Sequence, residues 1–179
     1  AISEIKARQA PQAEQRMNAF IKGNPASPYY AEAYYLRGQA QMIQGNWKAA
    51  KHSHDIAEDN APTRELKGLA MLSRADCNVK LGHLELADRQ YTELELFYRD
   101  VTAVSHEEVL FKLGATNKEM GNTESADFWF NKVIEHYATG RYAAEARRLN
   151  SRLGDDGKGE PVLYSIQLAD FGDELKAKD

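Results

Sequence analysis

Apolar and polar residues follow one another along this chain with the period of a helix, and one longer pattern occurs three times. Each copy is an amphipathic segment that ends at a glycine, with an alanine five residues later and a large ring four residues after that. The copies cover residues 36–57, 73–94 and 112–133, and a fainter copy around Ala13, Met17 and Phe20 stands 37 residues before the first. The three complete copies share the glycines Gly45, Gly82 and Gly121, the alanines Ala50, Ala87 and Ala126, and the rings of His54, Tyr91 and Phe130. Such a pattern is typical of a repeated structural unit.

Each copy predicts a pair of helices joined by a tight turn. The glycine ends the first helix because it tolerates the left-handed conformation found there, and Asn46 and Asn122 are expected as N-caps of the following helices. The small alanine lets two helices approach closely, and Ser105 with Glu108 predicts a capping box. One such pair cannot bury its apolar face alone, so the pairs are expected to stack. The fold class expected is all-α.

The repeated pattern resembles the tetratricopeptide repeat (TPR), over roughly Ile5 to Leu153. In the last copy, Leu113 and Gly114 match the Leu-Gly pair of that family, with Ala126 and Phe130 in place. The first full copy matches at Tyr34, Gly38, Gly45, Trp47, Ala50, Ala57 and Pro62. The departures from the family are Arg37 and His54 in this copy and Ala75 in the middle copy. The resemblance implies that residues 1–153 form a right-handed superhelix of stacked antiparallel helix pairs, with a partial first repeat, three full repeats and a capping helix.

A longer phrase narrows the resemblance. The segments 24–33 (NPASPYYAEA) and 137–146 (YATGRYAAEA) align at a constant offset of 113 residues. Each joins one repeat to the next through a small residue, a tyrosine and Glu-Ala, as in the TPR proteins of the bacterial envelope. The resemblance therefore implies the periplasm or cell envelope of a bacterium.

The last 26 residues break the helical pattern. Residues 154–161 are rich in glycine and charge and are expected to form a linker. Residues 162–179 then begin with alternating β-formers, which place Tyr164, Ile166 and Leu168 on one face of a strand. This segment resembles the first strand of a SPOR domain, with Ala169 in place of the family's glycine. We expect either the truncated start of such a domain or a short C-terminal β-tail.

Composition and charge narrow the function classes. The formal net charge is −4, which gives no general attraction for nucleic acid, and no apolar run approaches the roughly 20 residues of a membrane span. Cys77 is the only cysteine, and the five histidines lack the spacing of a metal site. No phosphate-binding loop or nucleophile motif is present. We therefore expect no enzyme, no cofactor and no metal.

Recognition of another protein is what remains. The TPR resemblance implies that the first helix of each pair lines the inner wall of the stack. Its inward positions are Tyr35, Gln39 and Met42, then Leu72, Asp76 and Val79, then Phe111, Ala115 and Lys118. Tyr35, Leu72 and Phe111 would form an apolar ladder, which suits a helix or an extended apolar segment. These side chains could equally pack within the superhelix or against a second copy.

Two functions follow from these patterns. One is a non-catalytic protein-interaction scaffold in the bacterial envelope, with partners from its assembly or division machinery. The other is a peptidoglycan-associated module, in which a complete SPOR domain would bind denuded glycan strands.

Overall fold

The structure, a computed structural model, describes residues 2–151, which form helices and no strand. The expected linker at 154–161 and the expected strand at 162–179 lie outside the described residues. The helices are α1 (Ile2–Gly23), α2 (Tyr30–Ile43), α3 (Trp47–Asp59), α4 (Arg64–Lys80), α5 (Leu84–Phe97), α6 (His106–Glu119), α7 (Thr123–His136) and α8 (Ala143–Leu149). The all-α expectation is confirmed for the part of the chain that is described.

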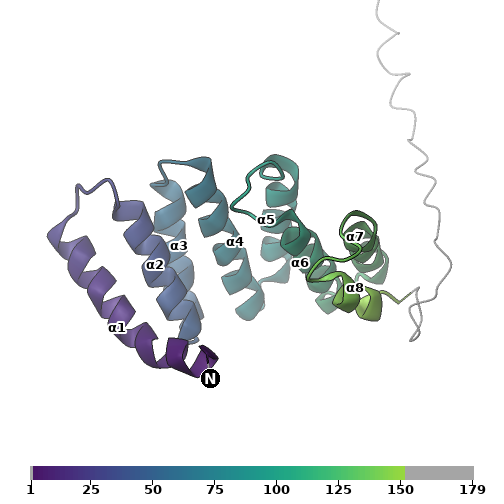
Figure 1. Ribbon diagram of the computed structural model, residues 1–179, viewed down its shortest axis with the longest axis horizontal. Coiled ribbons are helices and arrows are strands. Elements are labelled where there is room, and N and C mark those ends of the chain that lie inside the picture. Colours follow the sequence, from purple (N-terminus) through teal and green to yellow (C-terminus); the bar gives the residue numbers. More distant parts are fainter. Residues whose placement is uncertain (1, 152–179) are drawn as a thin grey trace, which may run out of the picture.

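The helices stand side by side in chain order, from α1 at one end of the array to α8 at the other (Figure 1). Each helix packs against the next, and short connections turn each one back along its predecessor. Contacts also join α2 to α4 and α6 to α8, which are first helices of successive pairs. The structure is therefore a stack of helix pairs, as the repeats predict, while its right-handed winding stays a prediction.

Three glycines make the turns within the pairs, as the sequence predicts. Gly45, Gly82 and Gly121 have φ values of 76°, 78° and 80°, the left-handed region that other residues avoid. After α2, the Gly45 N–H donates to the Met42 carbonyl (3.0 Å) and the Asn46 N–H donates to the Gln41 carbonyl (2.9 Å). This pair of bonds defines a Schellman motif and satisfies the last carbonyls of the helix.

The predicted caps are correct in position but not all in chemistry. Asn46 and Asn122 do occupy the N-cap positions of α3 and α7, but neither side chain makes a cap hydrogen bond. The reason is the preceding turn, which holds their backbone at ψ 61° and 70°, away from the extended ψ of a capping residue. Ser105 does cap α6, since its hydroxyl accepts from the Glu108 N–H at 3.3 Å. Thr63 caps α4 in the same way and was not predicted.

Small residues let the helices of a pair meet. Ala50, Ala87 and Ala126 are 0%, 0% and 1% exposed. A Cβ atom at Gly38 would lie 2.5 Å from the His54 ring, and one at Gly114 would lie 2.6 Å from the Phe130 ring. In the first and last copies the glycine therefore lies directly against the ring and leaves no room for a larger residue, whereas the middle copy has Ala75 at this position.

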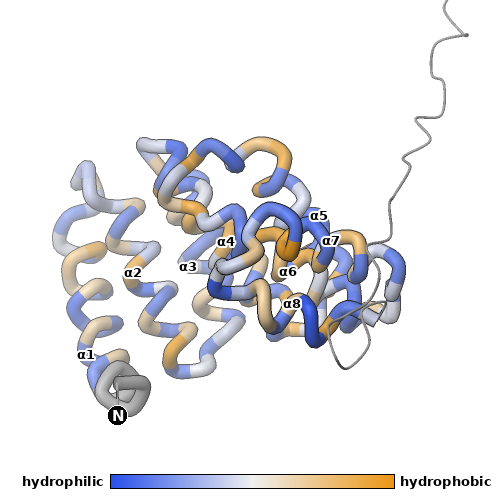
Figure 2. The backbone as a smooth tube through the Cα atoms, turned by 45° about the vertical axis from the view of Figure 1, so that its right-hand side comes forward, coloured by the Kyte–Doolittle hydropathy of each residue, from blue (hydrophilic) through white to orange (hydrophobic). Residues whose placement is uncertain are grey.

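The core is divided into layers along the array. One apolar cluster joins α2, α3 and α4, a second joins α4, α5 and α6, and a third joins α6, α7 and α8. Apolar residues recur along each helix, including α1 and α2 at the N-terminal end (Figure 2). Each helix pair thus depends on its neighbours for burial.

Candidate functional site

The nine predicted site residues lie, as expected, on α2, α4 and α6, but the apolar ladder is interrupted. Leu72 is only 8% exposed and belongs to the central core cluster. The Phe111 ring stacks on Tyr142, with ring centroids 4.8 Å apart, so the N-terminal end of α8 covers it. Of the three ladder residues, Tyr35 alone lines a cavity described below. Packing within the stack, the alternative to an exposed ladder, therefore holds for Leu72, whereas Tyr35 and Phe111 are both half-buried.

Polar members of the predicted set are engaged in contacts within the stack. Asp76 accepts from the Tyr91 hydroxyl at 2.6 Å and forms an ion pair with Lys112, which also approaches Glu108 at 3.2 Å. Burial by itself would lower the Lys112 pKa, but the two carboxylates raise that pKa above its ordinary value. Lys118 donates to the Leu149 carbonyl at 2.6 Å. These contacts join α4, α5, α6 and the end of α8.

The remaining predicted residues differ in what surrounds them. Met42, Val79 and Ala115 are half-buried, and Val79 packs against the central cluster. Gln39 lines a cavity on one side and donates to the Ser73 hydroxyl of α4 at 2.7 Å. Of the predicted set, Tyr35 and Gln39 are the two that line the cavities described next.

An apolar opening lies at the N-terminal end of the array. A cavity of about 520 Å³ lies between α1 and the start of α2, and one of about 370 Å³ continues it along the same two helices. They share Met17 and Leu36, so we treat them as one feature, the α1/α2 groove. The groove is lined by Gln9, Ala10, Ala13, Met17 and Phe20 from α1, and by Tyr29, Glu32, Ala33, Tyr35, Leu36, Gln39, Ala40 and Ile43 from α2 and the residue before it.

Three large apolar side chains are exposed along the groove. Tyr29, Leu36 and Ile43 are 63%, 52% and 47% exposed. They are seven residues apart, which is close to two helical turns, so they lie on one face. The other large apolar residues exposed in the described part of the chain are Leu96 and Phe97, at the end of α5. A contiguous exposed apolar stripe is typical of a protein-interaction site.

Polar contacts fix the two walls of the groove. The Glu14 carboxylate of α1 accepts from the side-chain amides of Gln41 and Gln44 of α2, each at 2.7 Å. Glu32 is the one charged side chain among the lining residues, and it has no ion-pair partner in the described part of the chain. The groove is thus an apolar channel whose two helices are joined by hydrogen bonds and whose lining contains one acidic group.

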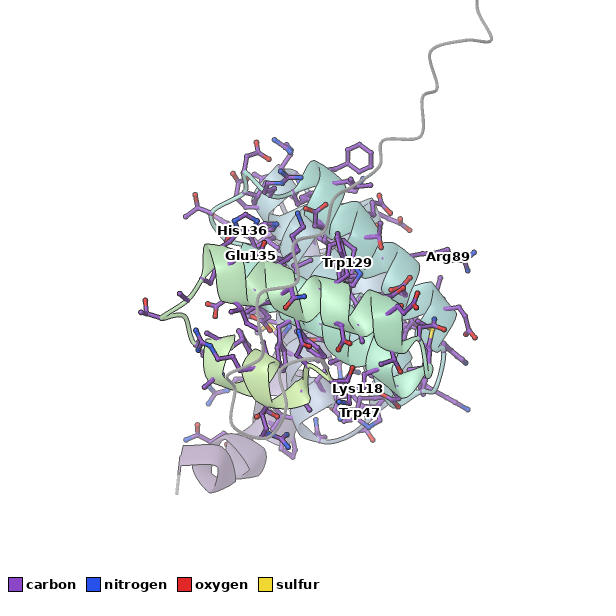
Figure 3. The ribbon with its side chains drawn as sticks, turned by 90° about the vertical axis from the view of Figure 1, so that its right-hand side faces the viewer. Trp47, Arg89, Lys118, Trp129, Glu135 and His136 are labelled. Atoms are coloured by element: carbon purple, nitrogen blue, oxygen red, sulfur yellow. The ribbon has the colours of Figure 1, made fainter. Side chains whose placement is uncertain are left out.

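The opposite end of the array is closed. Figure 3 faces that end, where α7 and α8 lie nearest the viewer. There α8 covers the third core cluster with Tyr142, Ala146 and Leu149, and the labelled Glu135 and His136 are exposed at the end of α7. Among residues 2–151, the apolar surface is therefore covered by a helix at one end of the stack and left open at the other.

Sequence reasoning missed most of this groove, although signals for it are present. The predicted site lies on the inner wall of the first helices, whereas the groove lies between α1 and α2. Met17 and Phe20 belong to the fainter repeat, where a core role is the natural expectation. The seven-residue spacing of Tyr29, Leu36 and Ile43 is readable from the sequence. What is not readable is that no described helix covers them.

Two further observations concern chemistry and membranes. Within the described residues, no group of three His, Cys, Asp or Glu side chains is placed to hold a metal ion. Over the same residues, no helix combines the length and the apolar character that a bilayer crossing requires.

Comparison with known proteins adds no assignment. No family model matches the chain, and a search of curated proteins found no relative.

Proposed function

We propose that this chain is a non-catalytic protein-interaction scaffold that binds an apolar segment of a partner protein in the α1/α2 groove. The observation that carries the proposal is the stripe of Tyr29, Leu36 and Ile43, exposed above an apolar channel. Burying such side chains on binding releases roughly 25 cal/mol for each Å² of apolar surface removed from water. Aromatic and aliphatic anchors in a preformed channel are the usual centre of a protein interface.

The scaffold proposal includes a TPR-like superhelix with a right-handed winding. Support comes from the Schellman turns at equivalent glycines and from the recurrent contact between a glycine and a ring. It also comes from Tyr29 and Tyr142, which are 113 residues apart and occupy the N-cap positions of α2 and α8. A place in the bacterial envelope, with assembly or division proteins as partners, rests on the two matching inter-repeat phrases and is part of the same proposal.

The groove can be tested by selecting peptide ligands and then measuring their affinity for variants with a charge placed inside or outside the groove. Peptides of about 20 residues from a random display library would be selected on the full chain and measured against two variants. Leu36→Glu places a charge in the groove, and Leu96→Glu places the same charge on α5, at a leucine of similar exposure. We expect selected peptides to be rich in apolar residues and to lose at least tenfold in affinity for Leu36→Glu alone.

The result is clear in either direction because both leucines are exposed and neither change should unfold the chain. Equal far-ultraviolet circular dichroism and equal unfolding midpoints of the two variants would establish this. Peptides that bind both variants as well as the parent chain would eliminate the groove as the binding site.

A further inference from the structure

The contact between α1 and α2 repeats the contact between α3 and α4. Arg37 donates from its guanidinium to the Asn18 side-chain oxygen at 3.3 Å, and Arg74 forms an ion pair with Asp55 at 3.4 Å. Asp55 and Arg74 each lie 37 residues after their counterparts, Asn18 and Arg37. The surface formed by α1 and α2 is therefore equivalent to the surface formed by α3 and α4, and the second can be used to interpret the first.

On α3 and α4, the surface equivalent to the groove is occupied by a helix, and that helix is α2. Tyr34 of α2 packs in one cluster with Ala57 of α3 and Ala70 of α4. Backbone of α2 at Gly38 lies directly against the His54 ring, and Gln39 donates to Ser73 at 2.7 Å. The groove formed by α3 and α4 is thus closed by a helix lying along both.

The residues that α2 covers are the counterparts of the groove residues. His54, Ala57 and Ala70 are all 0% exposed beneath it, and Ser73 is also buried. At the same repeat positions, 37 residues earlier, stand Met17, Phe20, Ala33 and Leu36, which all line the open groove. The α1/α2 groove is therefore a helix-binding surface on which the described structure places no helix.

We propose that the partner supplies this helix: an amphipathic α-helix of about four turns lies in the α1/α2 groove as α2 lies on α3 and α4. This inference rests on the proposed function and names the class of segment that is bound. Because α2 forms a hairpin with α3, the bound helix runs antiparallel to α1. Its N-terminal end then lies beside Phe20, and its C-terminal end lies beside Gln9 and Ile43.

The lining of the groove also defines the side chains of the bound helix. Gln39 of α2 donates to the hydroxyl of Ser73, and the residue equivalent to Ser73 in the groove is Leu36. The residue of the bound helix that corresponds to Gln39 therefore meets an aliphatic side chain. An apolar residue is required there, since a buried amide without a partner costs about 1–3 kcal/mol. Glu32 favours a lysine or arginine beside the apolar stripe.

Two labelled peptides of equal length and composition distinguish a helix from other apolar ligands. Both consist of 18 leucine, alanine and lysine residues. One has leucines spaced three and four apart, and in the other leucine alternates with lysine or alanine, which is the period of a strand. Fluorescence anisotropy with the full chain should show binding of the helical peptide at least tenfold tighter than binding of the strand-forming peptide. Leu36→Glu should weaken that binding at least tenfold, and Leu96→Glu should leave it unchanged.

The charge is tested by Glu32→Gln. With the helical peptide, this change should weaken binding about threefold to tenfold at low salt, and the difference should shrink at 0.5 M salt. Binding that is unaffected by Glu32→Gln would overturn the assignment of a basic residue to this position.

The orientation is tested by a nitroxide at the N-terminus of the helical peptide. It should broaden the amide resonances around Phe20 more strongly than those around Gln9 and Ile43. The reverse pattern would overturn the antiparallel placement that follows from α2.

Other occupants give different results. Tighter binding of the strand-forming peptide, lost in Leu36→Glu, would overturn the helix and leave the proposed scaffold intact. Failure of both peptides, together with failure of every library-selected peptide, would refute the groove itself. If the parent chain sediments as a dimer and Leu36→Glu as a monomer, the occupant is a second copy and the inference is wrong.

Discussion

Two neighbouring layers of this molecule have the same repeat pattern and opposite surroundings. In the layer of α3 and α4, the helix before them covers Ala50, His54 and Ala57, which are all 0% exposed. In the layer of α1 and α2, the equivalent Ala13, Met17 and Phe20 border an open apolar groove. The comparison teaches that a repeat position is not inside or outside by its own chemistry. It becomes core only when a further helix is stacked on it.

The largest difference in stability should come from replacing leucine by alanine once in the covered core and once in the open groove. Leu72→Ala removes a side chain that is 8% exposed within the central cluster and should lower the free energy of unfolding by about 2–5 kcal/mol. Leu36→Ala removes the same atoms from a side chain that is 52% exposed and should change the free energy of unfolding by less than about 0.5 kcal/mol. Urea unfolding measures both. Similar losses would mean that the α1/α2 groove is part of the core.

A second contrast uses pH, because the covered layer contains a titratable ring where the open layer has Met17. His54 is fully buried, its ring nitrogens have no hydrogen-bond partner among the described residues, and burial lowers its pKa to about 4. In the unfolded chain its pKa is about 6.5. Between these values the unfolded chain binds a proton that the folded chain excludes, so this contribution to stability is complete above about pH 6.5 and is lost as pH falls toward 4.

The expected loss is on the order of 3 kcal/mol, because each pKa unit corresponds to about 1.4 kcal/mol. The control is His54→Phe, chosen because Phe130 faces Gly114 in the last layer as His54 faces Gly38 here. Unfolding free energies of both proteins, measured from pH 7.5 to pH 4, should diverge on the acid side. Parallel curves would show that the folded chain accepts the proton at His54 without opening.

The smallest contrast adds atoms in place of removing them. Ala50→Leu inserts a large side chain where α2 and α3 meet and should cost roughly 1–3 kcal/mol. Ala13→Leu makes the same change 37 residues earlier, at an exposed position on the groove wall, and should alter stability by no more than about 0.5 kcal/mol. Thermal midpoints report the difference. Equal destabilisation would mean that Ala13 is covered as Ala50 is, and would contradict the open groove.

Much of the fold could be predicted because it depends on contacts that are local in sequence. The turns at Gly45, Gly82 and Gly121 follow from a backbone conformation that glycine tolerates and other residues avoid. The buried alanines follow from helical spacing. The caps at Asn46 and Asn122 were predicted less well, since the Schellman turn before each one satisfies the local backbone in another way.

The candidate site could be predicted only in part, because exposure depends on helices far away in the sequence. The repeat pattern places Phe111 on an open wall, but Tyr142, 31 residues later, stacks on it. The same pattern predicts that Asp76 binds a partner protein, but its carboxylate forms an ion pair with Lys112 of a different repeat. Tyr35 and Gln39 are the predicted residues that do border the groove, and their neighbours from α1 were not predicted.

The sequence by itself determined the helical period, the positions of the turns, and the small and large residues that pair within each repeat. These are set by backbone conformation and by side chains three to five residues apart. The tertiary structure alone decided which of the equivalent apolar surfaces is covered. That depends on whether another helix is stacked on the repeat: α2 covers α3 and α4, while no described helix covers the equivalent surface of α1 and α2.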